Sequence, residues 1–382
     1  MSRRILLVEP FFAGSHAAWA EGWQSASRHD IHLLTHEGAA WRWRMRGSAV
    51  TLAAATADWV AEHGTPDVVV ATDMLDVAAY LGLTRRVLGD PAVALYLHEN
   101  QLTYPRRPGE ALDQGLAWAM WRSLVAADEV WCNSDFHRDE VRTALGGFLA
   151  DVPDRDHLGL LPEIAARLVT LHVGVDLAGI SPPPTRENHP GGPLVLSNQR
   201  WHHDKDLGSV LRALRRLAER GRRFRVALVG DDRGGERAAL QPLVDDLGDR
   251  VVHAGLLPRH DYIDLLGRAD VVVSAARNEF FGIAVVEALA AGAIPVLPDA
   301  LAYPEVVPAR FHAAALYREG ELTSALESAI TDVEGRRAAV AGLAQEVRRF
   351  DWSVMAPRYD DSVERLVASQ ADGEFRDGSS AR

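Results

Sequence analysis

Hydrophobic residues are grouped in short runs that alternate with amphipathic or alanine-rich stretches along the chain. In the first half, each run is followed by polar residues or glycine before the next helical pattern begins. Continuous apolar strands of this kind are typical of a parallel sheet that is buried on both faces, with helices as the crossovers. The pattern predicts a Rossmann-like domain with strands at residues 5–8, 31–34, 68–71, 93–97, 129–132 and 168–173.

A proline-rich stretch at residues 179–192 interrupts this alternation. It contains three consecutive prolines, Pro182 to Pro184, followed by glycines near its end, so we expect an extended linker. The alternation then starts again and ends in a helical pattern from residue 319 to about residue 369. It predicts strands at 193–196, 225–229, 251–253, 271–274 and 294–297, and helices that include 207–220 and 281–291.

Two Rossmann-like domains in tandem are therefore expected, an α/β architecture of two doubly wound parallel sheets. Ligands of such sheets bind outside the carboxyl ends of the strands, so we expect the two domains to face each other across a cleft that holds the site. The expected divisions are an N-terminal domain at 1–178, the linker at 179–192, a C-terminal domain at 193–350, a helix at 351–370 that crosses back to the N-terminal domain, and a disordered tail at 371–382.

Composition and charge limit the kinds of partner. With 47% apolar and 25% charged residues, the chain is typical of a globular protein. A formal net charge of −12 means that a nucleic-acid partner needs a local basic patch. The single cysteine, Cys132, excludes an intrachain disulfide and a cysteine-based zinc cluster.

No run approaches the ~20 apolar residues of a membrane span, and the run at 5–8 is too short for a signal peptide. We expect a cytoplasmic protein with no membrane partner.

Two glutamates mark the sharpest candidate site in the second domain. Glu279 lies in the loop after the strand at 271–274, and Gly282 opens a helix on which Glu287 follows about a turn and a half later. Backbone amides at a helix start bind anions, so a diphosphate fits there. A carboxylate on the helix can accept ribose hydroxyls, and one in the preceding loop can accept the hydroxyls of a sugar. The alternative is that both acids merely complement the helix dipole.

Positive charge for such a diphosphate is available after the strand at 193–196, where Arg200 and Lys205 lie in one loop. Charge-assisted hydrogen bonds to a leaving phosphate act mainly in the transition state, so they lower the barrier without a metal ion. The alternative is a solvated pair of surface charges.

Candidate metal ligands are present but unconvincing. Aspartates occur as Asp-x-Asp triplets at 154–156 and 204–206, and His202 and His203 are adjacent. Lys205 lies inside the second triplet, where its charge competes with an ion, and adjacent residues seldom point the same way. We interpret these matches as coincidental and predict no metal and no other cofactor.

The first domain carries polar side chains where its predicted strands end. After the strand at 5–8, Gly14 lies in a turn where the backbone can approach a ligand closely. After the strand at 93–97, His98 begins a polar cluster and is the candidate to contact a reacting sugar. The alternative is a histidine that fills the core. Asn133 and Ser134, after the next strand, are secondary candidates.

The stretch from Glu279 to Glu287 resembles the E-x7-E motif of retaining glycosyltransferases of the GT-B class, especially family four. In that family the first glutamate faces the donor sugar and the second the ribose, and an arginine and a lysine face the diphosphate. A Gly-Gly pair often faces the donor phosphates as well, and Ala13 departs from that pair. The resemblance implies catalytic roles for His98, Arg200, Lys205 and Glu279, and donor contacts by Gly14, Ser15, Phe281, Gly282, Ile283 and Glu287.

Further stretches narrow the resemblance to one branch of these enzymes. Over roughly residues 4–365, the chain is similar to the tRNA-queuosine α-mannosyltransferases. This resemblance implies a nucleotide-sugar partner, GDP-mannose, and transfer of mannose, without inversion and without a metal, to the cyclopentene diol of queuosine in a tRNA anticodon. The stretches that carry it are 9–16, 41–49, 98–101, 200–206 and 279–282.

An RNA acceptor has some support from the residues themselves. The stretch from Trp41 to Arg46 interleaves two aromatic rings with three arginines, a combination that can stack an unpaired base and bind its phosphates. The alternative is an arginine-rich loop on an acidic protein. With the first domain as the acceptor side, we expect RNA contacts by Trp41, Trp43, Arg44, Arg46, Glu99, Asn100, Arg106 and Arg107.

Three other functions remain compatible with the sequence. A family-four transferase can act on a lipid or small-molecule acceptor, which needs no queuosine. A sugar-nucleotide epimerase of the same fold would convert the donor without any acceptor. A non-enzymatic RNA-binding module would neither transfer nor hydrolyse a donor.

Overall fold

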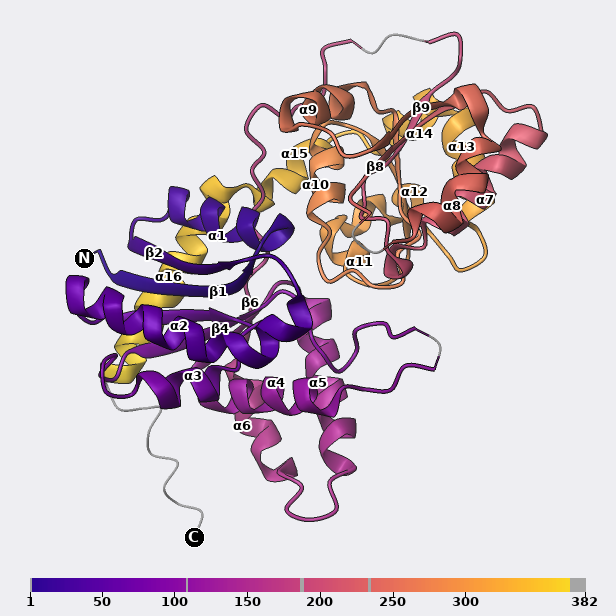
Figure 1. The fold of residues 1–382 in the computed structure, drawn as a ribbon. Helices are drawn as coiled ribbons and strands as arrows, with labels where there is room; N and C mark the ends of the chain where they lie inside the picture. The colour runs from indigo at the N-terminus through magenta and orange to yellow at the C-terminus, as the bar shows by residue number, and fades with distance from the viewer. Residues whose placement is uncertain (1, 108, 186–188, 233–234, 372–382) are drawn as a thin grey trace. The chain divides into compact units, whose positions relative to one another are not determined.

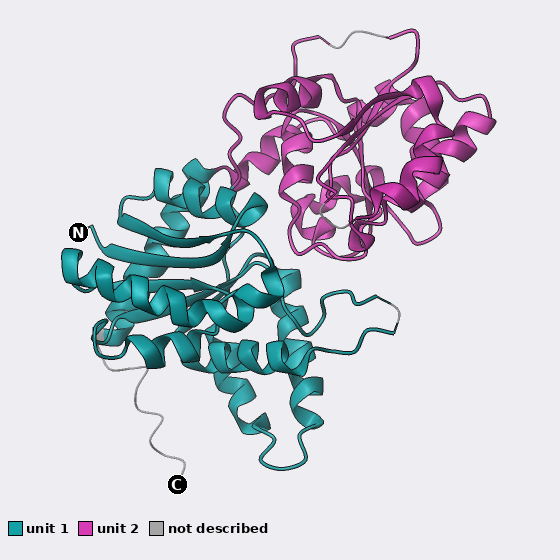
Figure 2. Ribbon diagram, in the orientation of Figure 1, with its two compact units in different colours: residues 1–174, 352–382 teal, residues 175–351 magenta. Residues whose placement is uncertain are grey.

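The computed structural model describes residues 2–107, 109–185, 189–232 and 235–371, and the chain divides into two compact units (Figures 1 and 2). Unit 1 comprises residues 1–174 and 352–382, and unit 2 comprises residues 175–351. Each unit contains a six-stranded sheet in which all paired strands are parallel. The predicted α/β fold with two doubly wound sheets is confirmed.

The sheet of unit 1 has the strand order β2-β1-β3-β4-β5-β6. Strand β1 lies between β2 and β3, so the chain leaves the first strand in two directions along the sheet. The carboxyl ends at such a switch point form a crevice in which ligands bind. The strands are β1 (Arg4–Phe12), β2 (Asp30–Glu37), β3 (Val68–Thr72), β4 (Ala92–Leu97), β5 (Glu129–Cys132) and β6 (Leu168–Thr170).

Helices cover both faces of this sheet, as the continuous apolar strands require (Figure 1). On one face, Leu6 and Val8 join a core to which α2, α3, α4 and α5 contribute. On the other face, aromatic rings of α1 and α16 pack on Tyr96 and Trp131. The helices are α1 (Gly14–Ala26), α2 (Trp41–His63), α3 (Val77–Thr84), α4 (Gln114–Ala126), α5 (Asp135–Ala150), α6 (Leu161–Arg167) and α16 (Trp352–Ala371).

Helix α16 belongs to unit 1 although it follows unit 2 in the sequence. Its first residue, Trp352, packs against glycines on two other segments: a Cβ atom at Gly22 would lie 2.0 Å from the indole Nε1, and one at Gly174 would lie 2.2 Å from the ring. Trp23 also donates a hydrogen bond to Asp360 at 3.0 Å. The helix ends at residue 371, and the predicted disorder of the tail falls on 372–382, outside the described residues.

The sheet of unit 2 has the strand order β12-β11-β10-β7-β8-β9, so its switch point involves β7 and its neighbours β10 and β8. Strand β12 is only two residues long, too short for the hydrophobic pattern to predict. The strands are β7 (Leu194–Ser197), β8 (Arg225–Val229), β9 (Val251–Gly255), β10 (Val271–Val273), β11 (Ile294–Pro298) and β12 (Leu316–Tyr317).

Unit 2 also holds most of the remaining helices. The helical pattern predicted from residue 319 onwards is broken into several helices, the last of which is α16. Across the described part of the chain, no helix is both long and apolar enough to cross a membrane. The helices of unit 2 are α7 (Leu207–Glu219), α8 (Arg237–Asp245), α9 (Arg259–Arg268), α10 (Ile283–Ala290), α11 (Tyr303–Val306), α12 (His312–Ala315), α13 (Leu322–Thr331), α14 (Val333–Ala339) and α15 (Leu343–Glu346).

Candidate active site

Lys205 is the centre of a charged cluster where β7 and β10 end in unit 2. Its buried ammonium group donates to the carbonyl oxygen of Asn278 at 2.6 Å and to Glu279 Oε2 at 3.1 Å, and lies 3.6 Å from Asp204 Oδ2. The structure therefore brings together the predicted lysine and the first predicted glutamate. Lys205 is also the only lysine in the sequence, among 41 lysines and arginines.

Glu279 is held beside this lysine by a hydrogen-bond network from the end of the sheet. The amide nitrogen of Gln199 donates to Glu279 Oε2 at 3.4 Å and to the Tyr303 hydroxyl at 3.1 Å. Ser274 donates to the Gln199 oxygen at 3.0 Å. The Glu279 side chain is 15% exposed, so the network fixes its position and leaves a small part of it accessible. Gln199, Ser274 and Tyr303 are supporting residues that the sequence pattern did not single out.

Gly282 precedes helix α10, whose first residue is Ile283, rather than the predicted start at residue 281. The glycine has a left-handed backbone with φ of 98°, which side chains rarely adopt. Its position turns the chain from the Glu279 loop into the helix, so the unpaired first amides lie next to the Lys205 cluster. The ring of Phe281 is buried against Phe350, with centroids 5.0 Å apart, so its backbone rather than its side chain remains for a donor contact.

Asp204 is a buried carboxylate of the same cluster. Burial alone would raise its pKa, but a hydrogen bond from His202 at 2.5 Å and the charges of Lys205 and Arg200 lower the pKa to about 2. The predicted Arg200 is exposed, and its charge acts on this cluster. Asp206, the other acid of the triplet, caps α7 and pairs with Arg277 at 2.8 Å. Both acids therefore have protein partners, which favours the interpretation of this triplet as coincidental.

Glu287 lies on α10 and is held by two residues of α9. Arg259 Nη1 lies 2.5 Å from one carboxylate oxygen, and the Tyr262 hydroxyl donates to the other at 3.0 Å. Burial raises the pKa of Glu287, and Arg259 offsets part of that effect. Asn198 at the end of β7 donates to the same tyrosine hydroxyl at 2.9 Å. A ribose diol would have to share this carboxylate with Arg259, a residue that sequence reasoning missed.

His98 in unit 1 lies at the end of β4 and is fixed on several sides. Its backbone nitrogen donates to Asp73 Oδ1 at 3.0 Å, and its carbonyl oxygen accepts from the Asn133 side chain at 2.9 Å. Its ring stacks on His16 with centroids 3.8 Å apart and meets the Trp19 ring edge-on at 5.1 Å. Asn133, a secondary candidate, therefore supports His98 from the neighbouring strand.

Glu9 joins both histidines and is the residue of this site that sequence reasoning missed. It lies on β1, longer than predicted, and is completely buried. Its Oε2 atom lies 3.0 Å from His16 Nδ1 and 3.5 Å from His98 Nε2. Glutamate and histidine also bind zinc, and these three groups offer ligand atoms within 4.8 Å of one another. The signal in the sequence was an acid directly after the predicted strand at 5–8 and a histidine seven residues later.

The protonation states in this cluster are set by opposing effects. Burial alone would raise the pKa of Glu9, but His16 and His98 outweigh it, so the pKa lies well below its usual range. Burial alone would lower the pKa of His16, but Glu9, Asp73 and Glu99 outweigh it and raise the pKa. Burial, with His16 next to it, lowers the pKa of His98 to about 4. At neutral pH Glu9 is therefore ionised and His98 is neutral, while Glu9 favours the protonated form of His16.

The other residues predicted near His98 have differing surroundings. Gly14 and Ser15 are exposed at the first turn of α1, where the first amides of a helix have no partner within it. Glu99 is half-buried and acts on His16. Asn100 is completely buried, and its oxygen accepts from the Thr103 nitrogen at 2.9 Å. We therefore assign Asn100 to the shape of the loop rather than to direct contact with an acceptor.

The stretch from Trp41 to Arg46 forms the first turns of α2, so its interpretation as a surface loop is wrong. The Trp43 side chain is 69% exposed, as a base-stacking platform requires. Arg46 pairs with Asp113, and Arg42 pairs with Glu110 in the segment after β4. This segment also carries the exposed Arg106 and Arg107, while Trp41 is exposed and Arg44 half-buried on α2. The predicted cations therefore share one part of unit 1 but are partly neutralised by acids.

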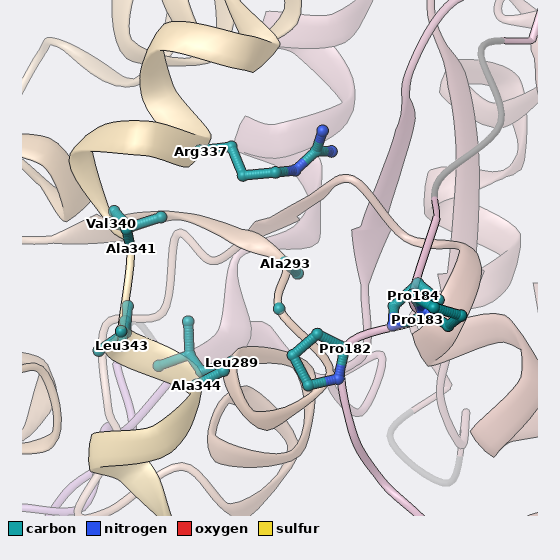
Figure 3. Close-up of a pocket in the computed structure, with 12 residues that line it drawn as sticks. Pro182, Pro183, Pro184, Leu289, Ala293, Arg337, Val340, Ala341, Leu343 and Ala344 are labelled. Carbon is teal, nitrogen blue, oxygen red and sulfur yellow. The ribbon is translucent and has the colours of Figure 1, made fainter.

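A cavity of about 320 Å³ lies elsewhere in unit 2, between the proline-rich stretch and the helices α14 and α15 (Figure 3). It is lined mainly by apolar side chains such as Leu289 and Leu343. Its charged lining residue, Arg337, is paired with Asp270 at 2.9 Å. None of the predicted site residues lines it, so it is not the candidate active site.

The fold and the Lys205–Glu279 cluster define the class of the protein. Residues 184–341 match the family described as Glycosyl transferases group 1. Residues 4–175 match the family described as tRNA-queuosine alpha-mannosyltransferase N-terminal. The chain is a glycosyltransferase of the GT-B class. Along its first half, the chain is similar to the tRNA-queuosine alpha-mannosyltransferases.

Individual relatives agree with this assignment. The tRNA-queuosine alpha-mannosyltransferase of Drosophila melanogaster is 29% identical over 315 residues, which is 80% of this chain and 81% of the relative. A GDP-mannose:cellobiosyl-diphosphopolyprenol alpha-mannosyltransferase of Xanthomonas campestris is 27% identical over 187 residues, 47% of this chain and 48% of the relative.

Solved structures show the same fold. Sucrose-phosphate synthase from Thermosynechococcus elongatus matches with a TM-score of 0.76 and 15% identity, over 96% of this chain and 100% of that chain. The Anabaena protein HepE in complex with UDP-glucose matches with a TM-score of 0.69 and 18% identity, over the same shares of the two chains. At these identities the likeness concerns the fold alone.

Proposed function

We propose that this protein transfers mannose from GDP-mannose to the cyclopentene diol of queuosine in a tRNA anticodon, with retention of configuration and without a metal ion. The observation that carries the donor half is the contact of Lys205 with Glu279 beside the start of α10. The acceptor half rests on the family match of residues 4–175 and on the Drosophila relative. Such a reaction takes place in the cytoplasm, where the tRNA is available.

The donor diphosphate binds at the first amides of α10, beside Lys205 and Arg200. Two cations and the helix dipole together offset the charge that a metal ion offsets in other transferases. Glu279 accepts hydrogen bonds from hydroxyl groups of the mannose. Its carboxylate is held in place by Lys205 and remains partly accessible. Glu287 accepts hydrogen bonds from the ribose hydroxyls while it stays paired with Arg259.

Transfer with retention needs no protein nucleophile in this scheme. As the bond between the sugar and the diphosphate breaks, an acceptor hydroxyl attacks the anomeric carbon on the leaving-group face. An oxygen of the β-phosphate takes the proton of that hydroxyl, so the products are the mannoside and GDP. Lys205 and Arg200 stabilise the negative charge that grows on the departing phosphate.

Donor binding can be tested on the single lysine. Labelling with ¹³C-lysine gives one lysine spin system, because the chain has no other lysine. Saturation with GDP should shift the signals next to Nζ, because the diphosphate competes with Glu279 for the ammonium group. Uridine diphosphate at the same concentration is the control for the base. Unchanged lysine signals at saturating GDP would exclude Lys205 from the donor site.

Acceptor binding can be tested with tRNA that contains or lacks queuosine. Radiolabelled mannose should pass from GDP-mannose to the first tRNA and not to the second. Trp43→Ala should raise the KM for tRNA about tenfold, since stacking of one base contributes ~1–3 kcal/mol. Leu83→Ala removes another exposed apolar side chain, on α3, and should leave that KM unchanged. Equal labelling of both tRNAs would contradict queuosine as the acceptor.

A further inference from the structure

The contacts of Glu287 in unit 2 point to a function for two residues of α9, Arg259 and Tyr262. We propose that both are positioning residues that hold the Glu287 carboxylate in one orientation, so that each of its oxygens accepts a hydrogen bond from one hydroxyl group of the donor ribose. This inference rests on the proposed function, which places the ribose at Glu287.

Each oxygen of the Glu287 carboxylate has one partner in the described part of unit 2. Arg259 Nη1 donates to Oε1 at 2.5 Å, and the Tyr262 hydroxyl donates to Oε2 at 3.0 Å. A carboxylate has about four lone-pair sites, two on each oxygen. One site per oxygen therefore remains, which matches the two neighbouring hydroxyl groups of a ribose.

The direction of the Tyr262 hydroxyl is fixed by Asn198 at the end of β7. The side-chain nitrogen of Asn198 donates to the hydroxyl oxygen at 2.9 Å and to the carbonyl oxygen of Ala284 at 2.6 Å. Because an amide nitrogen only donates, the single proton of the tyrosine is directed at Glu287. Burial, together with the charge of Glu287, raises the pKa of Tyr262, so the hydroxyl keeps this proton.

Arg259 holds the other carboxylate oxygen from the surface of the unit. Its side chain is 46% exposed, whereas that of Glu287 is 9% exposed. A second nitrogen of the guanidinium donates to the carbonyl oxygen of Asp176 at 3.2 Å, and the group lies 5.7 Å from the centre of the Tyr262 ring. Glu287 is therefore held on both oxygens and keeps a small accessible part for a ligand.

The alternative is that these contacts only fasten α9 to α10. Apolar residues of similar volume often replace a buried ion pair with no loss of stability, so packing alone does not require a glutamate here. The neighbours of Glu287 along α10, Val286 and Ala288, are buried and apolar. Burial raises the pKa of Glu287, which shows that the position disfavours a charge. A fixed, ionised acceptor for a diol gives that unfavourable burial a function.

The test compares GDP with 2′-deoxy-GDP, which lacks one of the two hydroxyl groups. Calorimetric titration of the full chain should show that the wild type binds GDP about tenfold or more tightly than the deoxy form, as expected for a hydrogen bond to a charged group. Tyr262→Phe keeps the ring and removes the hydroxyl, and should reduce this ratio to about threefold or less.

Tyr317→Phe is the matched control. Tyr317 is another buried tyrosine of unit 2, but its hydroxyl donates to the carbonyl oxygen of Ser274 and not to Glu287. Its replacement should therefore keep the wild-type ratio. An equal reduction in both tyrosine variants would overturn the positioning role, because it would show a general effect of removing a buried hydroxyl.

Glu287→Gln separates this inference from the proposed function and should bring the ratio close to one. A wild-type ratio in Glu287→Gln would overturn the placement of the ribose, and the inference with it. A reduced ratio in Glu287→Gln together with a wild-type ratio in Tyr262→Phe would overturn the positioning role alone. If Tyr262→Phe does not fold, Arg259→Ala replaces a half-exposed side chain and should also reduce the ratio; an unchanged ratio there would overturn the proposal.

Steady-state transfer gives a second readout. Contacts with the ribose are made equally before and during the reaction, so Tyr262→Phe should raise the KM for GDP-mannose about threefold or more and leave kcat within about twofold of the wild type. Partial unfolding would instead lower kcat through a smaller active fraction. A lower kcat at an unchanged KM would contradict the positioning role.

Discussion

Replacing Lys205 with alanine removes the ammonium group that neutralises two carboxylates in unit 2. Its Nζ atom lies 3.1 Å from Glu279 Oε2 and 3.6 Å from Asp204 Oδ2. The three side chains are only 9%, 15% and 0% exposed, respectively, so water cannot replace the lysine without a rearrangement. The variant should therefore lose stability as well as transfer activity.

The size of the loss follows from the partners that remain. Removing one partner of a buried ion pair costs ~3–5 kcal/mol. We expect the lower end, ~3 kcal/mol, because Asp204 keeps its 2.5 Å hydrogen bond with His202 and Glu279 keeps some contact with water. In a domain of ~150–250 residues, 1 kcal/mol lowers Tm by about 2–4 °C, so unit 2 should melt about 6–12 °C earlier.

Calorimetry of Lys205→Ala, Glu279→Gln and the double variant measures this coupling. The double variant should melt at a higher temperature than Lys205→Ala, because one of the two uncompensated carboxylates is gone. Lys205→Arg keeps the charge but not the shape, and should lose transfer because a planar guanidinium does not reproduce the contacts of one ammonium nitrogen with Asn278 and Glu279. A Tm for Lys205→Ala within about 2 °C of the wild type would refute the burial argument.

Three further outcomes are expected. Arg200→Ala should lower kcat ~100-fold or more and change Tm only slightly, because the residue is exposed. Arg215→Ala on α7 should change neither kcat nor Tm, and equal rates for the two variants would contradict a catalytic role of Arg200. Gly22→Ala should lower the Tm of unit 1, because the new Cβ would overlap the indole of Trp352 on α16. Gly82→Ala is the control and should be neutral or stabilising, because nothing lies within 4 Å of its Cβ. Similar Tm values for the two variants would contradict the packing of Trp352 on Gly22. Burial raises the pKa of Asp73 to about 7, so the folded state holds a proton that the unfolded state releases near pH 4, and this contribution to stability falls as pH rises from about 4 to about 7. Asp73→Asn should therefore gain Tm relative to the wild type over that range, and a constant difference would contradict the raised pKa.

The fold was largely predictable because its signal is periodic. Strands buried on both faces produce unbroken apolar runs, and the linker prolines mark where the second series begins. The two-residue strand β12 was not predictable, since so short a strand depends on its neighbour β11 rather than on its own sequence. Helix α10 starts two residues later than predicted because Gly282 adopts a left-handed backbone conformation.

The donor site was predictable where its residues lie close together in the sequence. Glu279, Gly282 and Glu287 share one loop and helix, so spacing alone relates them. The residues that support them were not predictable, because Tyr303 and Arg259 lie on other elements and come close only in the folded chain. Arg259 in particular shows that Glu287 is not simply an open carboxylate.

The acceptor side shows the opposite limit. Glu9, His16 and Asp73 join His98 only through the strand order of the sheet, which brings the ends of β1, β3 and β4 together. The arginines at 42 and 46 looked like phosphate ligands in the sequence, but the acids that pair with them lie more than sixty residues away. Composition and local sequence patterns do not predict ion pairs between residues so far apart in the sequence.

The most direct test of the central claim is mass analysis of nucleosides from queuosine-containing tRNA after incubation with this protein and GDP-mannose. We predict that queuosine gains the mass of one hexose, that the new linkage is α, and that the gain persists in the presence of a chelator. Unchanged queuosine, with GDP-mannose intact or its mannose transferred to a lipid or small molecule instead, would contradict the assignment.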